Sequence, residues 1–226
     1  MSLNLYSVRA VAPWSDFSAF EQEILSLGLS PHLLCVARIT PLPYNPQPLP
    51  PDIIITSYNT VGALRAQNIS LNPKRLWCVG HRLAAEFPDS DTQSFASAES
   101  LLNALSQKQA GHALYLRGRL ISRDIATPLQ ATGWTVHQQY LYETHKTDID
   151  LSPFLMQDTA GFLLWSPQTA KAFFDSLGKR PLDKPLLCLS EQIATQVPVN
   201  LHPWIRVSKE KDAKAMIALI KQELGK

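Results

Sequence analysis

Short apolar runs alternate along the chain with segments in which apolar residues recur every three or four positions. The first pattern is typical of buried strands and the second of amphipathic helices. The predicted strands are Leu3–Arg9, His32–Ile39, Asp52–Thr56, Arg75–Val79, Thr92–Phe95, His112–Arg117, Trp134–Tyr142, Gly161–Trp165, Pro185–Leu189 and His202–Val207. The predicted helices are Asp16–Leu27, Tyr58–Ala66, Ala98–Gln107, Ser122–Thr132, Pro167–Leu177 and Lys209–Leu224. This alternation indicates an α/β fold, in which helices cover both faces of parallel sheets.

Two segments interrupt the alternation and divide the strands into two groups. Ten strands are too many for one small doubly wound sheet, so we expect two domains with five strands each. The segment Thr40–Pro51 is rich in proline, which fixes φ and lacks an N–H donor, so we expect a stiff extended connector and neither a helix nor a central strand. The polar stretch Glu143–Asp150 is the natural return connector.

An internal repeat supports this division. Landmark residues of the first half recur in the same order roughly 110 positions later, which is a usual length for one domain. The matched pairs are Arg9 with Arg117, Gly28 with Gly133, Thr40 with Thr144, Ser57 with Ser166, Gly80 with Ser190, and Ser97 with Ser208. The chain is therefore interpreted as a duplicated α/β unit.

Several of these landmarks fall where a predicted strand gives way to a helix. Ligands of open α/β sheets bind beyond the carboxyl ends of the strands, where the first amides of each helix are unpaired. Serine at such a junction can cap the helix, and the neighbouring amides can hold a carboxylate. The junction residues are Ser57, Gly80, Ser97, Ser166, Ser190 and Ser208. Binding of an anionic ligand and simple helix capping both remain open for each of them.

Arginines supply the candidate cations. Arg9 and Arg117 end equivalent strands, and we expect them to face ligand carboxylates; a solvated or locally paired arginine is the alternative. Arg119 and Arg123 follow Gly118 in a turn that is a weaker candidate for facing an anion.

Composition narrows the function classes. The chain has 226 residues, 45% hydrophobic and 18% charged, with a formal net charge of +2 and no run of basic residues, so we expect a packed core and no nucleic-acid binding. The chain has an odd number of cysteines, which are Cys35, Cys78 and Cys188. Each stands in an apolar run, as expected for a buried residue in a reducing cytoplasm. The N-terminus lacks the pattern of a signal peptide, and no apolar run is long enough to cross a membrane.

Common catalytic motifs are missing from the sequence. The six histidines form no HExxH pattern, and no GxGxxG, P-loop or GxSxG motif is present. The sequence therefore does not favour binding of a dinucleotide or a nucleoside triphosphate, metal chemistry or a serine-hydrolase mechanism. We expect no bound metal.

A series of short motifs resembles the uroporphyrinogen-III synthase family in order and spacing. The motifs are Ser7-Val8-Arg9-Ala10, Thr56-Ser57-Tyr58-Asn59, Val79-Gly80-His81-Arg82-Leu83-Ala84, Ser97-Ala98-Glu99, Leu116-Arg117-Gly118, Tyr142-Glu143-Thr144 and Ser166-Pro167-Gln168-Thr169. Together they span nearly the whole chain, although no single one is specific. Ala10, Leu83 and Ser190 depart from the family pattern, which usually has proline at the first position and often threonine at the second.

The resemblance implies two flavodoxin-like, doubly wound parallel-sheet domains joined by a two-stranded connector. Domain 1 then comprises residues 1–39 and 147–226, domain 2 comprises residues 52–139, and the connectors are 40–51 and 140–146. It further implies that the enzyme cyclises hydroxymethylbilane, an octacarboxylate, to uroporphyrinogen III with inversion of ring D and loss of water, without a cofactor. The pyrrole nitrogens supply the electrons for this reaction.

The resemblance also assigns roles to residues. Tyr142 is the candidate acid for the leaving hydroxyl, and its alternative is a tyrosine that only packs in the linker. The substrate-binding candidates are Arg9, Ser57, Asn59, Gly80, Ser97, Arg117, Gly118, Ser166, Gln168 and Ser190. We expect a cytoplasmic monomer that transiently contacts the preceding pathway enzyme. The rival interpretation is a non-catalytic two-domain module that binds tetrapyrroles or other anions, either a degenerate homologue or a cytosolic sensor.

Overall fold

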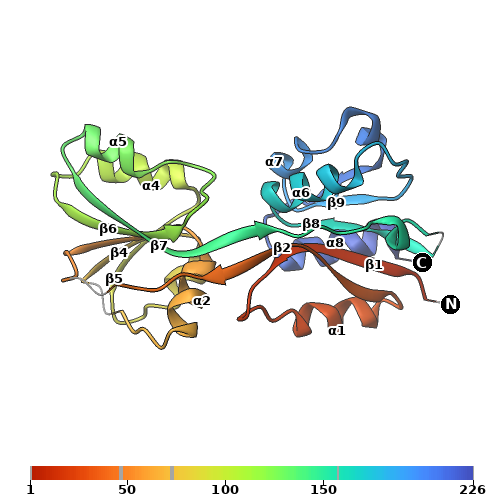
Figure 1. The fold of residues 1–226 in the computed structure, drawn as a ribbon, viewed down its shortest axis with the longest axis horizontal. Coiled ribbons are helices and arrows are strands. Elements are labelled where there is room, and N and C mark those ends of the chain that lie inside the picture. Colours follow the sequence, from red (N-terminus) through yellow and green to blue (C-terminus); the bar gives the residue numbers. More distant parts are fainter. Residues whose placement is uncertain (1, 46–47, 72–73, 157, 226) are drawn as a thin grey trace. The chain divides into compact units, whose positions relative to one another are not determined.

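The structure is a computed structural model that describes residues 2–45, 48–71, 74–156 and 158–225. The chain divides into two compact units, one formed by Met1–Arg38 with His145–Lys226 and the other by Ile39–Thr144. Every strand pair described within either unit is parallel, which confirms the predicted α/β class (Figure 1).

The first unit contains a five-stranded parallel sheet. Its strands are β1 (Asn4–Val11), β2 (Ser30–Pro41), β8 (Thr159–Leu164), β9 (Leu186–Cys188) and β10 (Ile205–Val207). They lie in the order β2-β1-β8-β9-β10, which is 2-1-3-4-5 when the strands are numbered along this unit. This is the flavodoxin-like order of doubly wound sheets.

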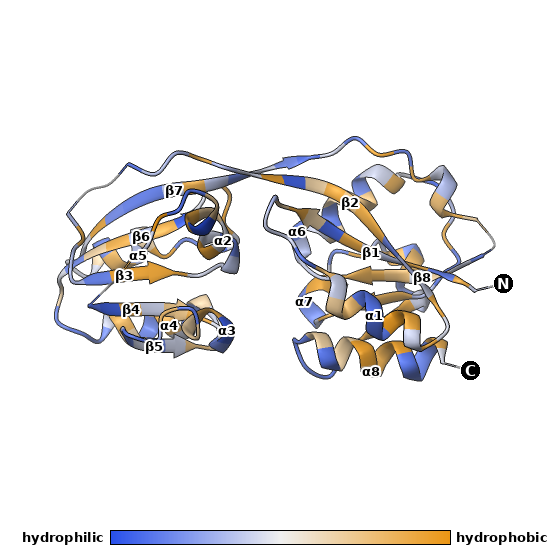
Figure 2. Ribbon diagram, turned by 90° about the horizontal axis from the view of Figure 1, so that it is seen from below, coloured by the Kyte–Doolittle hydropathy of each residue, from blue (hydrophilic) through white to orange (hydrophobic). Residues whose placement is uncertain are grey.

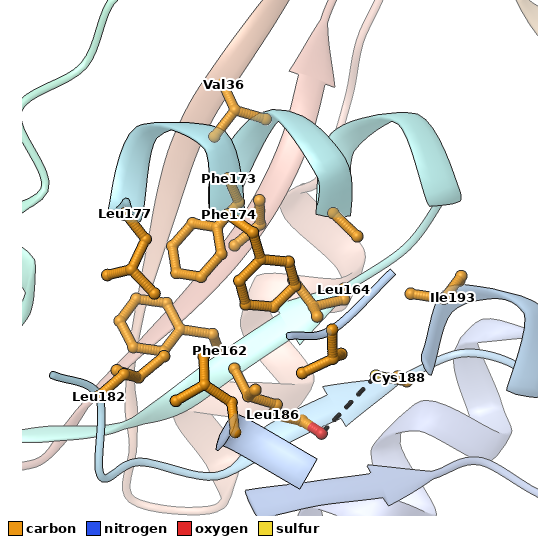
Figure 3. Packing of buried hydrophobic residues seen from close by; sticks show 14 of the residues in the cluster. Val36, Phe162, Leu164, Phe173, Phe174, Leu177, Leu182, Leu186, Cys188 and Ile193 are labelled. Carbon is orange, nitrogen blue, oxygen red and sulfur yellow. Dashed lines mark hydrogen bonds between the residues drawn. The ribbon is translucent and has the colours of Figure 1, made fainter. Parts of the chain in front are cut away.

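Helices cover both faces of this sheet. On one face α1 (Ser18–Ser26) and α8 (Ala213–Leu224) enclose a core that includes Leu5 and Leu163. On the other, α6 (Pro167–Leu177) and α7 (Glu191–Ala194) pack over Phe162 and Leu186 (Figure 3). Two 3₁₀ helices, η1 (Ser152–Phe154) and η2 (Val199–Trp204), complete the unit.

The second unit has the same arrangement with its strands in another chain order. Its strands are β3 (Asp52–Ile55), β4 (Arg75–Val79), β5 (Asp91–Phe95), β6 (His112–Gly118) and β7 (Thr135–Lys146). The order β7-β6-β3-β4-β5 becomes 2-1-3-4-5 when β6 is counted first, so the unit is a circular permutation of the same sheet. Helix α2 (Tyr58–Ala66) lies on one face, while α4 (Ala98–Ser106) and α5 (Ala126–Ala131) cover the other. The short α3 (His81–Ala84) follows β4.

The central strands are apolar because both faces of each sheet are covered. The four residues of β3 are all buried, and so are the six of β8. Figure 2 colours both strands largely as hydrophobic. Helix α2 begins where Ser57 accepts a hydrogen bond from Asn59 N–H, and α6 begins where Ser166 accepts one from Thr169 N–H. These caps fix the amino-terminal ends of both helices at the predicted residues.

Several predicted element bounds differ from the structure. The helix predicted over Ser122–Thr132, for example, is reduced to α5 at Ala126–Ala131. Strand β2 continues through Thr40 and Pro41, and β7 continues to Lys146, beyond the predicted strand end at Tyr142, so parts of both connector segments are strand. Pro46 and Gln47 of the first connector lie outside the described residues. The predicted strand His202–Val207 is reduced to β10, since Val199–Trp204 wind into η2. The helix predicted from Lys209 begins four residues later, because Asp212 caps it by accepting from Ala215 N–H.

Candidate functional site

The carboxyl edge of the second unit's sheet collects most of the predicted site residues. Because β3, β4, β5 and β6 are parallel, the residues that follow them lie along one edge. The residues placed there are Ser57, Asn59, Gly80, Ser97, Arg117, Gly118 and Tyr142. Tyr142 joins this edge because it is the register partner of Gly118 on the neighbouring strand.

The point at which the connections diverge lies between β6 and β3. The chain leaves β3 into α2 on one face of the sheet, and it leaves β6 into α5 on the other (Figure 1). Such a switch point opens a crevice at the carboxyl ends of the two strands, which is where doubly wound folds bind ligands. A hydrogen bond of 2.9 Å between Thr56 Oγ1 and the buried Tyr115 Oη joins β3 to β6 here. Sequence reasoning missed Tyr115, although a tyrosine within an apolar strand signals a need for a polar partner.

Tyr142 lies directly against the backbone of Gly118. A Cβ atom on Gly118 would stand 2.5 Å from Tyr142 Cε2, 2.6 Å from Cζ and 2.9 Å from the phenolic oxygen, so only glycine leaves room for the ring. The register of β6 and β7 shifts between Arg117 and Gly118, and this irregularity sets Tyr142 opposite the glycine.

The phenol of Tyr142 is buried and polar. Its side chain is 7% exposed, and burial raises its pKa above the ordinary value of 10.0. Hydrogen bonding with the Ser57 side chain and with the Gly118 backbone, together with the charge on Arg117, opposes part of this rise in the pKa. Tyr142 is therefore protonated at neutral pH and can act as a proton donor.

Arg117 is held by neutral groups. Its Nε donates to Gln138 Oε1 at 2.9 Å, its Nη1 donates to the Gly118 carbonyl at 3.1 Å, and its guanidinium lies 4.7 Å from the centre of the Tyr140 ring. Within the described residues no carboxylate lies at ion-pair distance from it, so its positive charge is not neutralised by a contact. Arg119 differs, because its Nε lies 3.2 Å from Glu143 Oε2.

Helix capping accounts for several junction residues. Ser57, Ser97 and Ser166 each accept a hydrogen bond from an amide of the helix that follows, whereas Ser190 makes no such side-chain bond. Gly80 has a φ of 91°, a left-handed conformation that favours glycine at this turn. The capping interpretation therefore holds for three of the serines, and in each of these helices one first-turn amide is already bonded to the serine.

The equivalent edge of the first unit holds Arg9, Ser166, Gln168 and Ser190. Arg9 ends up between aromatic rings: its guanidinium lies 3.8 Å from the Trp165 ring centre and 4.5 Å from that of Phe17. Its Nε donates to Ser7 Oγ at 2.8 Å. Burial lowers the pKa of Arg9 to about 10, against the opposing charge of Glu21, so the side chain stays cationic at neutral pH. Gln168 is exposed in the first turn of α6.

A cavity of about 390 Å³ lies at the other, amino-terminal edge of the second unit's sheet. Asp52, Arg75, Trp77 and Trp134 are among its lining residues. The buried Asp52 carboxylate accepts hydrogen bonds of 2.7 Å from both Arg75 and Trp77, whereas the buried Nε1 of Trp134 has no hydrogen-bond partner among the described residues. Because the cavity lies at the opposite edge of the sheet, it is separate from the candidate site.

The described residues contain no group of three or more His, Cys, Asp or Glu side chains arranged to hold a metal ion. Among the helices that the structure describes, none has the length and apolar character needed to span a membrane.

Comparisons with known proteins place these observations in a family. Residues 18–218 match the model of the family described as uroporphyrinogen-III synthase HemD. A search of curated proteins finds no match. The fold is similar to that of uroporphyrinogen-III synthetase from Helicobacter pylori, with a TM-score of 0.63 and 18% identity over 98% of this chain and 99% of that one. The fold is also similar to that of a mutant uroporphyrinogen III synthase from Thermus thermophilus, with a TM-score of 0.61 and 16% identity over 99% of both chains. At such identities the likeness concerns the fold alone.

Proposed function

This chain belongs to the uroporphyrinogen-III synthase HemD family, whose members are enzymes, and we propose that it converts hydroxymethylbilane into uroporphyrinogen III. The linear tetrapyrrole is closed with inversion of ring D, and one water is lost. The observation that carries the proposal is the protonated, buried phenol of Tyr142, held against Gly118 where the sheet connections diverge.

We further propose that the fold is two flavodoxin-like domains joined by a two-stranded connector made of β2 and β7. Both units have strands in the order 2-1-3-4-5, directly in one and by circular permutation in the other. Each long strand contains one of the two boundaries, at Arg38–Ile39 in β2 and at Thr144–His145 in β7. The internal repeat of the sequence agrees with this duplication.

The role proposed for Tyr142 is general acid catalysis. Its hydroxyl gives a proton to the terminal hydroxyl of the substrate, which leaves as water while a pyrrole nitrogen supplies the electron pair. The substituted carbon of ring D then attacks the resulting azafulvene to give a spiro intermediate, which fragments and recombines in the inverted sense. A proton is finally lost, and Tyr142 is reprotonated. The raised pKa of Tyr142 suits a group that must hold its proton at neutral pH until the substrate arrives.

Substrate carboxylates are the proposed partners of the unneutralised cations. Arg117 lacks a carboxylate at ion-pair distance in the described residues, and the Arg9 side chain is oriented by Trp165 and Ser7. A guanidinium that is already oriented loses little entropy when it binds a carboxylate in two-pronged fashion. The helix N-termini that follow Ser57 and Ser166 add amide donors at the same edges, although Pro167 has no N–H and contributes none.

An isomer assay tests the proposal. Hydroxymethylbilane closes spontaneously to the uninverted type I product, so the assay measures how much type III uroporphyrin forms above that background. Wild-type protein should give type III as the major isomer, and Tyr142→Phe should lower its rate by about 100-fold or more while the protein stays folded. Type III formation at the wild-type rate in Tyr142→Phe would remove the acid role. Tight tetrapyrrole binding without inversion in the wild type would instead favour the non-catalytic binding module.

A further inference from the structure

Arg82 lies at the carboxyl edge of the second unit's sheet, in the helix that follows β4. Tyr58 begins α2 directly after Ser57, and Arg82 lies in the first turn of α3 after β4, which pairs with β3. The Arg82 guanidinium carbon lies 4.1 Å from the centre of the Tyr58 ring. Arg82 is therefore stacked on the residue that follows Ser57, whose side chain lowers the pKa of Tyr142 against the effect of burial.

The Tyr58 ring is held in place from its far end. Its hydroxyl donates to Glu86 Oε1 at 2.7 Å, and the other oxygen of the same carboxylate pairs with Arg65. The Glu86 side chain is only 16% exposed. Both oxygens of Glu86 are thus engaged by Tyr58 and Arg65, and this carboxylate does not neutralise Arg82.

Arg82 itself remains exposed and without an acidic partner. In the part of the chain that the structure describes, no carboxylate lies at ion-pair distance from its guanidinium, and its contact is with the face of a ring. Stacking uses the face of a guanidinium and leaves its N–H edge available.

The residue that follows Arg82 is apolar and buried. Leu83 is 2% exposed. Leu83 therefore offers no polar group at the junction, and the preceding residue, Arg82, presents the polar side chain there instead.

We propose that Arg82 is a further substrate-binding residue that holds one carboxylate of the tetrapyrrole, with Tyr58 as its positioning residue. The inference rests on the proposed function for the identity of the substrate. Arg82 and Ser57 follow the neighbouring strands β4 and β3, so the carboxylate held by Arg82 would lie along the same edge of the sheet as the other candidate binding residues.

Equilibrium binding separates this inference from the proposed function. The probe is uroporphyrin III, an octacarboxylate whose fluorescence reports its binding whether or not the protein catalyses ring closure. Arg82→Ala should raise the Kd by about tenfold at low salt, as expected for loss of a charge-assisted hydrogen bond at a partly exposed site. The difference should shrink at high ionic strength. Arg82→Lys should recover part of the affinity, because lysine keeps the charge but not the planar fork.

Lys108→Ala is the matched control. Lys108 also rests against an aromatic ring, 5.5 Å from the centre of Trp77, but it lines the cavity at the opposite edge of the same sheet. Its loss removes the same charge and should leave the Kd within about twofold of wild type. The proposal would be overturned if Arg82→Ala and Lys108→Ala lost equal affinity for uroporphyrin III, or if Arg82→Ala bound it with the wild-type Kd.

The positioning role of Tyr58 is tested by a double-mutant cycle. Tyr58→Leu should weaken binding in the wild-type background by several-fold and have no further effect in Arg82→Ala. Equal effects in both backgrounds would show that Tyr58 acts independently of Arg82. With hydroxymethylbilane as substrate, loss of type III formation in wild type would refute the proposed function, while the uroporphyrin comparison would still decide the role of Arg82 in binding.

Discussion

Replacing Gly118 by alanine tests the contact on which the candidate acid depends. The added Cβ would stand 2.5 Å from Tyr142 Cε2 and 2.6 Å from Cζ, whereas carbon atoms in contact are ordinarily about 3.5 Å apart or more. The ring must therefore move by roughly 1 Å or the strand must shift. Tyr142 is buried, so neither movement is free.

The magnitude follows from two opposed effects. Overpacking a well-filled site costs about 1–3 kcal/mol. The φ of Gly118 is not in the left-handed region, so alanine is compatible with the backbone and returns about 0.4–1 kcal/mol by restricting the unfolded chain. We expect a net loss of about 1–2 kcal/mol in the free energy of unfolding. Type III formation should also fall, because the hydroxyl of Tyr142 moves away from Ser57.

Urea denaturation of a set of variants provides the measurement. In a Tyr142→Ala background, Gly118→Ala should lower the free energy of unfolding only slightly, because the ring that the new Cβ would overlap is absent. In a Tyr142→Phe background the full loss of stability should remain, because the ring carbons are still present. Gly111→Ala is the control: its Cβ would meet nothing nearer than 3.5 Å, an ordinary contact with Trp134. An equal cost of Gly118→Ala with and without the Tyr142 ring would refute this reasoning.

Two further predictions concern the neighbouring hydroxyl groups. Thr56→Val should lower the free energy of unfolding by about 1–2 kcal/mol in urea denaturation, because it leaves the buried Tyr115 hydroxyl without its partner. The double variant Thr56→Val with Tyr115→Phe should lose less stability than Thr56→Val alone, because no hydroxyl is then left unpaired. Burial raises the pKa values of both Tyr115 and Tyr142. Each phenol therefore adds stability that is complete below pH 10 and is lost as the pH rises through the folded-state pKa, so alkaline unfolding should start later in Tyr115→Phe than in wild type; an unchanged profile would contradict this assignment.

Local sequence signals predicted the elements that carry the site, but not the contacts within it. The bounds of α2 and α6 follow from Ser57 and Ser166, whose caps act over three residues of chain. The apolar run of β4 predicted its bounds in full. Such features depend on near neighbours in sequence, and a sequence pattern therefore contains them.

The remaining features depend on residues that are distant in the chain. Tyr142 lies on Gly118 only because the register of β6 and β7 shifts beside Arg117, and no local pattern fixes that shift. The Arg9 environment combines Phe17 with Trp165, which belong to segments far apart in sequence. The β-prone run before β10 formed the 3₁₀ helix η2 instead, where Pro203 supplies no N–H for strand pairing.

Three arginines at the carboxyl edges of the two sheets share one arrangement, although Arg119 at one of these edges pairs with Glu143. Arg9, Arg82 and Arg117 are each held against an aromatic ring, at 3.8, 4.1 and 4.7 Å from a ring centre, whereas Arg75 at an amino-terminal edge pairs with Asp52. An arginine paired with an acid must break that ion pair before it binds a substrate carboxylate. The free-energy cost of breaking the pair is considerable when the pair is partly buried. A ring supplies about 0.5–2 kcal/mol of attraction, enough to orient the guanidinium, and competes for none of its N–H donors. Aromatic support therefore orients these cations without an acidic partner, and it leaves for a ligand carboxylate the N–H donors that no protein hydrogen bond uses, which are fewer for Arg117 than for Arg82.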